Sequence, residues 1–252
     1  MWDWIGQIDQ LKRRSRPVVL VTVAGVEGSA PREIGAKILV LKDGTFFGTI
    51  GGGNLERLAI EEAQKLIDSG NSTKIRFPLG AKTGQCCGGV VELLFESLNT
   101  GPQLYIFGAG HVGQALSRAL NDSAFTVHVI DERQEWISQL PSGVIGHCLD
   151  PEIFISQNQF SPTHSYFVIM THQHDLDETL VRLLLNQPHV YLGLIGSEAK
   201  WTRFQQRLSA RGIAEEQTKK VKCPVGIKNF GKSPSEIAIS IGAEILMLHY
   251  KS

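Results

Sequence analysis

Two adjacent cysteines, Cys86 and Cys87, stand between glycines in the segment GQCCGG, residues 84–89. A thiolate is a nucleophile and a ligand for soft metals, and neighbouring glycines allow a ligand to approach the backbone closely. The segment therefore predicts a thiol that acts on a bound ligand. Two small buried side chains are the alternative, because cysteine is often buried. The sequence leaves open which of the two thiols acts.

Two more glycine-rich segments come earlier in the chain, GSAPREIG at 28–35 and GTIGGGNLE at 48–56. The triple glycine leads directly into an expected helix, whose first N–H groups can hold a phosphate. Tight turns are the alternative, but three consecutive glycines cost chain entropy and so disfavour a purely structural purpose. The residues predicted to bind an anionic cofactor in this half of the chain are Arg32, Gly51, Gly52, Gly53, Asn54, Cys87, Gly88 and Gly89.

A glycine-rich turn at 108–113 (GAGHVG) follows the expected strand QLYIF and precedes an expected helix. This context is typical of a dinucleotide-binding Rossmann unit. Gly108 would permit the tight turn, Gly110 would let a pyrophosphate approach the backbone, and Gly113 would let helix and strand pack closely. The alternative is a Rossmann fold that binds no nucleotide, because fold does not dictate function.

An acidic residue, Asp131, ends the next expected strand and lies 23 positions after Gly108. This separation is close to the roughly 20 residues expected for a carboxylate that binds a ribose hydroxyl pair. The carboxylate favours NAD over NADP, whereas the nearby Arg133 weakens that preference. His111, inside the turn, either contacts a ligand or is merely exposed.

A cluster of histidines and acids, THQHDLDE at 171–178, follows another expected buried strand. Strand ends face the ligand crevice of a Rossmann sheet, so His172 and His174 are candidate ligand contacts. The run also resembles a metal-binding pattern, but no histidine follows Asp177, and the metal assignment stays unknown. Asp175 could instead cap the next helix. Ser197, after the segment LIG, could likewise cap a helix or face the crevice.

The elements that would position these residues divide the chain in two at the turn-rich segment LNTGP, 98–102. Apolar spacing predicts a helix at the start of the chain and a second helix that ends at Gly70. The expected strands of this half are 17–25, 36–41, 45–50, 73–79 and 89–96, with an Asp43-Gly44 hairpin turn.

Beyond the break, strands and helices alternate, as a parallel sheet requires. Helices are expected at 111–121 and 198–211, and Ser233-Pro234-Ser235-Glu236 predicts a capping box at the start of the last helix. The predicted fold class is α/β. An N-terminal α+β domain with glycine-rich turns spans 1–98, and a Rossmann-like parallel-sheet domain spans 103–252.

Composition excludes several classes of function. The 252 residues carry 25 Lys+Arg and 25 Asp+Glu, so the zero formal net charge gives no argument for binding nucleic acid or a membrane. No apolar stretch approaches the roughly 20 residues of a membrane span. The four cysteines form no disulfide framework and no zinc pattern. We expect a soluble, cytoplasmic protein.

The segments GSAPREIGAKILV, GTIGGGNLE and QCCGGVVELLFE resemble the first domain of the XdhC/CoxI family. GAGHVGQAL, VIDER, MTHQHDLDE, YLGLIGS and CPVGIKNFGKSPSEIAISIGAEIL match the same family in the same order, so the resemblance spans nearly the whole chain. The GQCCGG form is most similar to xanthine dehydrogenase accessory proteins.

The resemblance implies a maturation chaperone and not an enzyme. Such a protein binds molybdenum cofactor (molybdopterin), supports its sulfuration by a cysteine desulfurase, and inserts it into apo xanthine dehydrogenase. The CGG match carries the thiol function to Cys87, with Cys86 as its neighbour. Homo-oligomerisation stays open.

Two other functions remain as alternatives. An NAD-dependent oxidoreductase would bind NAD(P) through Gly108, Gly110, Gly113 and Asp131 and use His172 or His174 as acid–base. A nucleotide-sensing module would bind a nucleotide without turnover and would not need the cysteines. The residues predicted to bind a cofactor in this domain are Gly108, Gly110, His111, Gly113, Asp131, His172 and His174.

Overall fold

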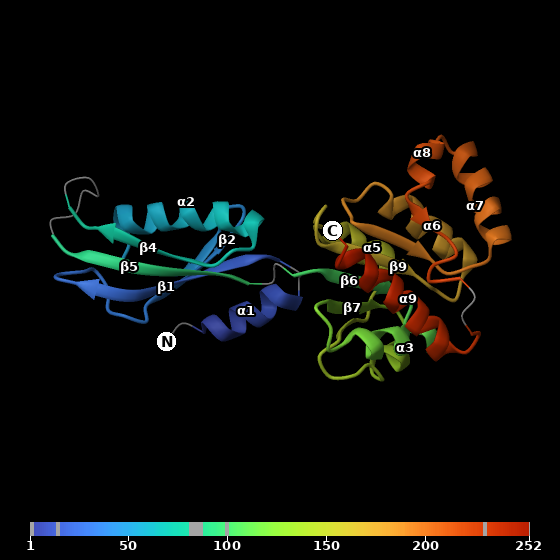
Figure 1. Ribbon diagram of the computed structural model, residues 1–252, viewed down its shortest axis with the longest axis horizontal. Coiled ribbons are helices and arrows are strands. Elements are labelled where there is room, and N and C mark those ends of the chain that lie inside the picture. Colours follow the sequence, from blue (N-terminus) through green and yellow to red (C-terminus); the bar gives the residue numbers. More distant parts are fainter. Residues whose placement is uncertain (1–2, 14–15, 81–87, 99–100, 229–230, 252) are drawn as a thin grey trace. The chain divides into compact units, whose positions relative to one another are not determined.

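The chain forms two compact units, residues 1–101 and residues 102–252 (Figure 1). The computed structural model describes residues 3–13, 16–80, 88–98, 101–228 and 231–251. We describe each unit by itself.

Unit 1 is a five-stranded antiparallel sheet with one helix on each face. Its elements are α1 (Trp4–Arg13), β1 (Val18–Glu27), β2 (Lys37–Leu41), β3 (Phe46–Gly48), α2 (Gly53–Ser69), β4 (Thr73–Pro78) and β5 (Val90–Leu98), and the strand order is β3-β2-β1-β5-β4. The longest pairing joins β1 to β5, from Val18 opposite Leu98 to Glu27 opposite Val90. This pairing places the end of β1 beside the start of β5.

Strand β1 is buried on both faces because it serves two cores. Successive side chains of a strand point to opposite faces, so Val19 and Val21 pack in the cluster under α2. Val18 and Leu20 pack with Leu11 of α1. The continuous apolar run at 17–25 therefore reflects a central strand between two helices.

Two turns of unit 1 follow the sequence expectation, and one strand is shorter than expected. The Asp43-Gly44 turn closes a hairpin in which the Leu41 N–H donates to the Thr45 carbonyl at 2.8 Å. Gly70 ends α2 in the left-handed conformation, with φ 65°. The strand expected over 45–50 covers only 46–48, because the chain turns at Thr49 to meet the start of α2.

Unit 2 is a doubly wound parallel sheet. Its elements are β6 (Gln103–Phe107), α3 (His111–Leu120), β7 (Thr126–Ile130), α4 (Gln134–Ile137), β8 (Ile145–His147), α5 (Pro151–Gln157), β9 (Ser165–Ile169), α6 (His174–Leu184), β10 (Tyr191–Leu194), α7 (Glu198–Ala210), α8 (Glu215–Thr218), β11 (Val221–Lys222) and α9 (Pro234–His249). The strand order is β11-β10-β9-β6-β7-β8. Counted from β6, this is the Rossmann order 3-2-1-4-5-6 read from the other edge.

Two hydrophobic cores lie on the two faces of this sheet. Leu104 and Ile106 of β6 pack with α3 and α9. Tyr105 and Phe107 of the same strand pack with α5, α6 and α7. β6 and β9 are neighbours in the sheet, and the chain adds later strands in opposite directions on either side of them. Ligands of such sheets bind outside the carboxyl ends of the strands at this switch point. A ligand of unit 2 would therefore be expected at the turns after β6 and β9.

Five short elements of unit 2 were not expected from the sequence. They are α4, β8, α5, α8 and β11, of which the longest has seven residues. Elements this short show too few repeats of an apolar period to be recognised. Asp150 caps α5 through the N–H groups of Glu152 and Ile153, and Pro151 occupies its first turn.

The capping box expected at the start of α9 is present. The Ser233 hydroxyl accepts a hydrogen bond from the Glu236 N–H, and the Glu236 carboxylate accepts one from the Ser233 N–H. Ser233→Ala is expected to lower the unfolding free energy of unit 2 by about 1 kcal/mol, because the Glu236 N–H loses its acceptor. Urea denaturation measures the change. Ser235→Ala is the control, because Ser235 lies in the first turn of the same helix and its side chain has no recorded hydrogen bond. Equal stability of the two variants would contradict the prediction.

Candidate functional site

The three glycine-rich segments of unit 1 meet at one end of its sheet. A Cβ added to Gly51 would lie 2.5 Å from Cβ of Pro31, so the second segment packs against the first. Ser29 forms a parallel bridge with Gly88, and a Cβ on Gly89 would lie 2.3 Å from the Ser29 carbonyl oxygen. Cys86 and Cys87 directly precede Gly88 in the sequence and lie outside the described residues.

Three consecutive glycines with positive φ start helix α2. The φ angles of Gly51, Gly52 and Gly53 are 124°, 73° and 65°, a backbone that other residues rarely adopt. Gly52 has no atom within 4 Å of an added Cβ, whereas Gly51 is packed. Both the positive φ and the contact with Pro31 thus require glycine at position 51. At position 52 only the positive φ requires glycine, and the space beside Gly52 is open.

The Glu56 carboxylate already occupies part of the expected phosphate cradle. It accepts hydrogen bonds from the N–H groups of Ile50 at 3.0 Å and Gly52 at 3.2 Å, because a glutamate in the first helical turn can reach back to the cap. For the N–H groups of Gly53 and Asn54, no acceptor is recorded in the described part of the chain. The N–H groups that remain for an anion are therefore those of Gly53 and Asn54. They are fewer than the sequence predicted, because Glu56 already accepts from Ile50 and Gly52.

Arg32 lies on the loop between β1 and β2, and its Cγ is 3.5 Å from the Cβ that Gly51 lacks. The side chain is exposed, and within the described ranges no carboxylate is recorded as its partner.

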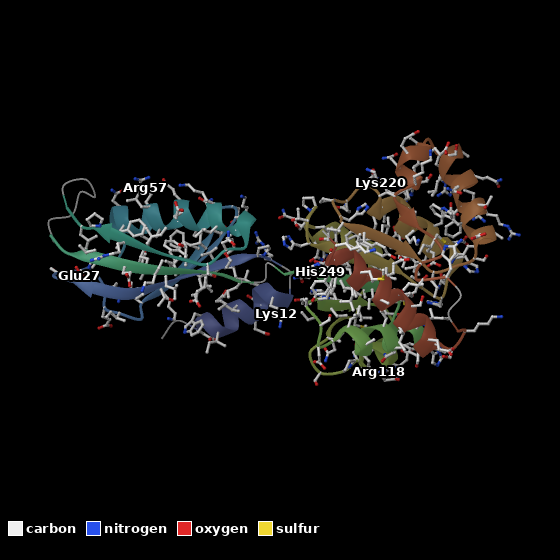
Figure 2. All side chains as sticks on the ribbon, viewed as in Figure 1. Lys12, Glu27, Arg57, Arg118, Lys220 and His249 are labelled. Carbon is white, nitrogen blue, oxygen red and sulfur yellow. The ribbon has the colours of Figure 1, made fainter. Side chains whose placement is uncertain are left out.

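The Asn54 side chain accepts from Arg57 Nε at 3.0 Å. Gly88, like Gly52, has open space beside it. Figure 2 marks this end of unit 1 with Glu27, at the end of β1, and Arg57, in α2.

The glycine turn of unit 2 has the close approaches that its spacing predicts. A Cβ on Gly108 would lie 2.4 Å from the Met170 carbonyl oxygen, and one on Gly113 would lie 2.0 Å from the Gly108 carbonyl oxygen. Gly110 has nothing within 4 Å of an added Cβ. The first and third glycines are thus required by packing, and the second faces open space at the start of α3.

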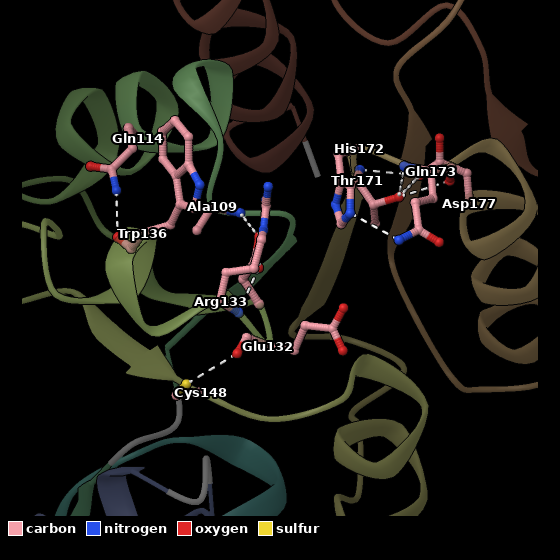
Figure 3. A network of polar contacts seen from close by, with 11 residues as sticks. Ala109, Gln114, Glu132, Arg133, Trp136, Cys148, Thr171, His172, Gln173 and Asp177 are labelled. Carbon is pink, nitrogen blue, oxygen red and sulfur yellow. Dashed lines mark hydrogen bonds and ion pairs between the residues drawn. The ribbon is translucent and has the colours of Figure 1, made fainter.

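Asp131 is buried and fully hydrogen-bonded. Its carboxylate accepts from Ala109 N at 2.8 Å and from Arg133 N, Nε and Nη2 at 3.0, 2.8 and 2.7 Å. Burial raises the pKa of Asp131, but the bonds from Arg133 and Ala109 outweigh it and hold the pKa below its ordinary value. A ribose hydroxyl pair would have to compete with four N–H groups for this carboxylate. Figure 3 shows Arg133 and Ala109 side by side at the turn.

His111 and Arg133 both contact Trp136 of α4. The His111 ring meets the Trp136 ring edge to face at 5.1 Å, and the Arg133 guanidinium lies 5.5 Å from its centroid. Gln114 Nε2 donates to the Trp136 carbonyl at 2.7 Å. Trp136 was not singled out from the sequence, because the short helix that carries it gave no periodic signal.

A small hollow lies at the switch point of the sheet. This hollow of about 10 Å³, room for about one water molecule, is lined by Gly108, Ile130, Asp131, Glu132, Pro151, Thr171, His172 and Leu176. Figure 3 shows the glycine-turn residues on one side of this edge and Thr171, His172, Gln173 and Asp177 on the other.

The histidines and acids at 171–178 do not form a metal centre. His172 Nε2 contacts Gln173 Nε2 at 2.9 Å, and no group of three or more His, Cys, Asp or Glu side chains that could hold a metal occurs among the described residues. The expectation that Asp175 caps α6 is wrong: Gln173 is the cap residue, without a side-chain bond, and the Asp175 carboxylate is exposed. Asp177 instead is buried and accepts from the Thr171 N–H and hydroxyl.

A larger hollow, about 500 Å³, lies beside the ends of β9 and β10 and was missed from the sequence. Its lining is Thr171, His174, Ile195, Gly196, Ser197, Ala199, Lys200, Arg203, Phe204 and Arg207. Lys200, Arg203 and Arg207 are spaced three and four positions apart, which puts them on one face of a helix. That spacing was the available signal. Ser197 caps α7 by accepting from the Lys200 N–H at 3.2 Å, one of the two expectations for it.

The two cysteines of unit 2 have contrasting surroundings. Cys148 is exposed. Cys223 is partly buried, and burial raises the pKa of its thiol to about 11. Since the thiolate is the reactive form, Cys223 is unsuited to nucleophilic chemistry near neutral pH.

The geometry defines a two-unit protein whose second unit is a Rossmann domain and whose first unit gathers three glycine-rich segments. The family model described as the XdhC Rossmann domain matches residues 104–245, more than half of the chain. The model of the XdhC and CoxI family matches residues 11–78. The chain belongs to the XdhC and CoxI family.

Three curated relatives are similar to the chain. It is 29% identical to the uncharacterized protein YqeB of Escherichia coli, over 95% of this chain and 45% of that protein, so it spans less than half the length of this relative. It is 25% identical to a probable xanthine dehydrogenase subunit of Bacillus subtilis, over 98% of this chain and 97% of the relative. The molybdenum cofactor insertion chaperone PaoD of Escherichia coli is 25% identical, over 90% of this chain and 82% of the relative.

Among solved structures, one described as a xanthine dehydrogenase of Bacillus halodurans matches 98% of this chain and 96% of its own, with a TM-score of 0.52 and 22% identity. This likeness concerns the fold. In the part of the chain that the structure describes, no helix combines the length and the apolar character needed to cross a bilayer.

Proposed function

We propose that this chain is an accessory chaperone, not an enzyme, that binds molybdenum cofactor, supports its sulfuration and inserts it into apo xanthine dehydrogenase. One observation carries the proposal. Three segments far apart in sequence, each rich in glycine, converge at one end of unit 1, through Gly51 on Pro31 and Ser29 on Gly88. Membership of the XdhC and CoxI family supports it, as do the names of two relatives.

The residues at this end fit the chemical groups of molybdopterin. Its phosphate suits the N–H groups of Gly53 and Asn54 and the guanidinium of Arg32, since backbone donors and arginine are the usual partners of phosphate. The open space beside Gly52 and Gly88 leaves room for close approach of a ligand to the backbone. A thiolate from Cys87, or its neighbour Cys86, suits the soft molybdenum–dithiolene centre.

The partners follow from this chemistry. Sulfuration exchanges an oxo ligand of the metal for sulfur, which a cysteine desulfurase would supply. Delivery requires contact with the apo form of xanthine dehydrogenase. We propose that both steps take place in the cytoplasm and involve no membrane or nucleic acid. Homo-oligomerisation is compatible with the proposal and is not needed by it.

No specific observation favours the oxidoreductase alternative or a bound NAD(P). The Asp131 carboxylate, which would hold the ribose, is bonded to Arg133 and Ala109. The hollow at the switch point holds about one water molecule. His172 lines this hollow beside Asp131 and Glu132, but its recorded side-chain contact is with Gln173. His174 lines the larger hollow, beside Lys200.

The test is the cofactor content of protein purified from a host that makes molybdenum cofactor. We expect wild-type protein to carry molybdenum and pterin, and the Cys86→Ala/Cys87→Ala variant to carry about tenfold less, the effect of losing about 1.4 kcal/mol of binding free energy. Metal analysis gives the molybdenum, and the fluorescence of the oxidised pterin gives the organic part.

Cys148→Ala is the matched control, because it removes an exposed thiol from unit 2. It should retain the wild-type content. Equal content in the wild type, the double variant and the control would refute the thiol contact. Absence of cofactor from all three folded proteins would refute the chaperone proposal itself.

A further inference from the structure

The 500 Å³ hollow of unit 2 lies at the carboxyl edge of the sheet, the edge at which ligands of a Rossmann sheet bind, and one strand away from the switch point. Thr171 follows β9, and Ile195 to Ser197 follow β10, so the hollow opens at the carboxyl ends of two neighbouring strands. Its volume is within the range of small-ligand sites, which is about 300–1,000 Å³. This position and size distinguish it from the hollow of about 10 Å³ beside the glycine turn.

Cationic side chains from one helix line the hollow, and buried carboxylates hold two of them in place. Lys200 Nζ lies 2.6 Å from Asp177 Oδ2, and Arg207 Nη1 lies 2.8 Å from Glu178 Oε2. The Asp177 and Glu178 side chains are only 1% and 4% exposed. These pairs restrict the two cations before any ligand arrives, which lowers the entropy cost of binding.

The same cations keep N–H groups for a ligand. An ammonium has three N–H donors; Lys200 gives one to Asp177 and one to the Ile195 carbonyl, which leaves one. The ion pairs of Arg207 use only Nη1, and its guanidinium lies 5.8 Å from the Phe204 ring centroid. Among the described residues, Arg203 has no ion pair or side-chain hydrogen bond. The acidic groups around the hollow are Asp177 and Glu178, both already paired, Asp175, 3.9 Å from Arg207, and Glu198, paired with Lys228.

We propose that this hollow is an anion site that binds the phosphate group of a small phosphorylated ligand. Several convergent N–H donors match the several oxygens of a phosphate, and arginine binds such groups with two parallel hydrogen bonds. The start of α7, capped by Ser197, adds the positive end of a helix dipole. The phosphate belongs either to a nucleotide or to another phosphate ester. The site lies in unit 2 and does not depend on the proposed cofactor function of unit 1.

Binding of inorganic pyrophosphate to the full chain, followed by calorimetry at low salt, tests the site. Arg203→Gln is expected to weaken binding about tenfold, because it removes a charge-assisted contact. Arg203→Glu should weaken it further through repulsion, and added salt should weaken wild-type binding. Arg203 is the residue to change, since it is exposed and its loss leaves no buried carboxylate unpaired.

Lys220→Gln is the control variant, because this exposed lysine follows α8 and does not line the hollow. It should bind pyrophosphate like the wild type. If the wild type shows no saturable binding, or if both Arg203 variants bind like the wild type, the proposal is wrong.

The source of the phosphate is distinguished by ADP. A nucleotide ligand should make ADP bind at least about tenfold more tightly than pyrophosphate, since its ribose and base add contacts. Equal affinities would support a site that recognises the phosphate group alone. In both cases the Arg203→Gln variant must lose affinity.

Discussion

Gly113→Ala is expected to prevent the stable folding of unit 2. The new methyl group would lie 2.0 Å from the Gly108 carbonyl oxygen, a backbone atom that cannot move without displacing β6. Relief of this overlap requires α3 to move away from the sheet, and this movement would disturb the packing of Leu116 and Leu120 in the core. We expect a loss of more than about 4 kcal/mol, a large part of the stability of an ordinary domain. Urea denaturation followed by tryptophan fluorescence and circular dichroism measures it.

Gly110→Ala is the control in the same turn. Its φ of −63° suits any residue, and no atom lies within 4 Å of the added Cβ. The stability of this variant should therefore equal that of the wild type within about 0.5 kcal/mol. If Gly113→Ala is as stable as Gly110→Ala, the turn can relax, and the close approach does not constrain the sequence.

The glycine turn also shows what could be predicted from the sequence of unit 2. The spacing of Gly108, Gly110 and Gly113 encodes a local strand–turn–helix geometry, so both close approaches and the Rossmann fold were predictable from a short segment. The hydrogen bonds of the Asp131 carboxylate were less predictable. Arg133 is two residues away, but the sequence does not show that its guanidinium folds back onto the Asp131 carboxylate, which also accepts from the Ala109 N–H of the glycine turn.

Unit 1 illustrates a different limit. The three glycine-rich segments were recognisable by composition, and their placement at strand ends was predictable. Their convergence depends on the antiparallel pairing of β1 with β5, which joins residues about seventy positions apart and is set by the whole sheet. The reach of Glu56 back to Ile50 and Gly52 also went unpredicted, because its side chain could equally have faced solvent.

The cationic hollow was missed for a related reason. Lys200, Arg203 and Arg207 have helical spacing, but exposed basic side chains on a helix are common, and spacing alone does not mark a site. What sets Lys200 and Arg207 apart is their contact with the buried carboxylates Asp177 and Glu178 of α6. Such a contact is visible only once the two helices are packed.

Lys200→Met is expected to destabilise unit 2 by about 3–5 kcal/mol. It removes the partner of Asp177, whose side chain is 1% exposed, and leaves a buried charge without compensation. Methionine fills much of the volume of the lysine stem, so the loss reflects the charge more than the packing. The unfolding free energy from urea denaturation at neutral pH measures the effect, and Lys220→Met, at an exposed position, controls for the loss of a surface lysine.

A second change separates the cost of the orphaned charge from the value of the pair. Asp177→Asn removes the charge but keeps an oxygen that can accept from the Thr171 N–H and hydroxyl. In the Lys200→Met/Asp177→Asn variant most of the lost stability should therefore return, because no buried charge remains. If Lys200→Met alone is as stable as Lys220→Met, water reaches Asp177, and the pair is worth no more than the roughly 0–1 kcal/mol of a surface ion pair. The preorganisation of Lys200 would then be lost as an argument for the anion site, which would depend on Arg203 and Arg207.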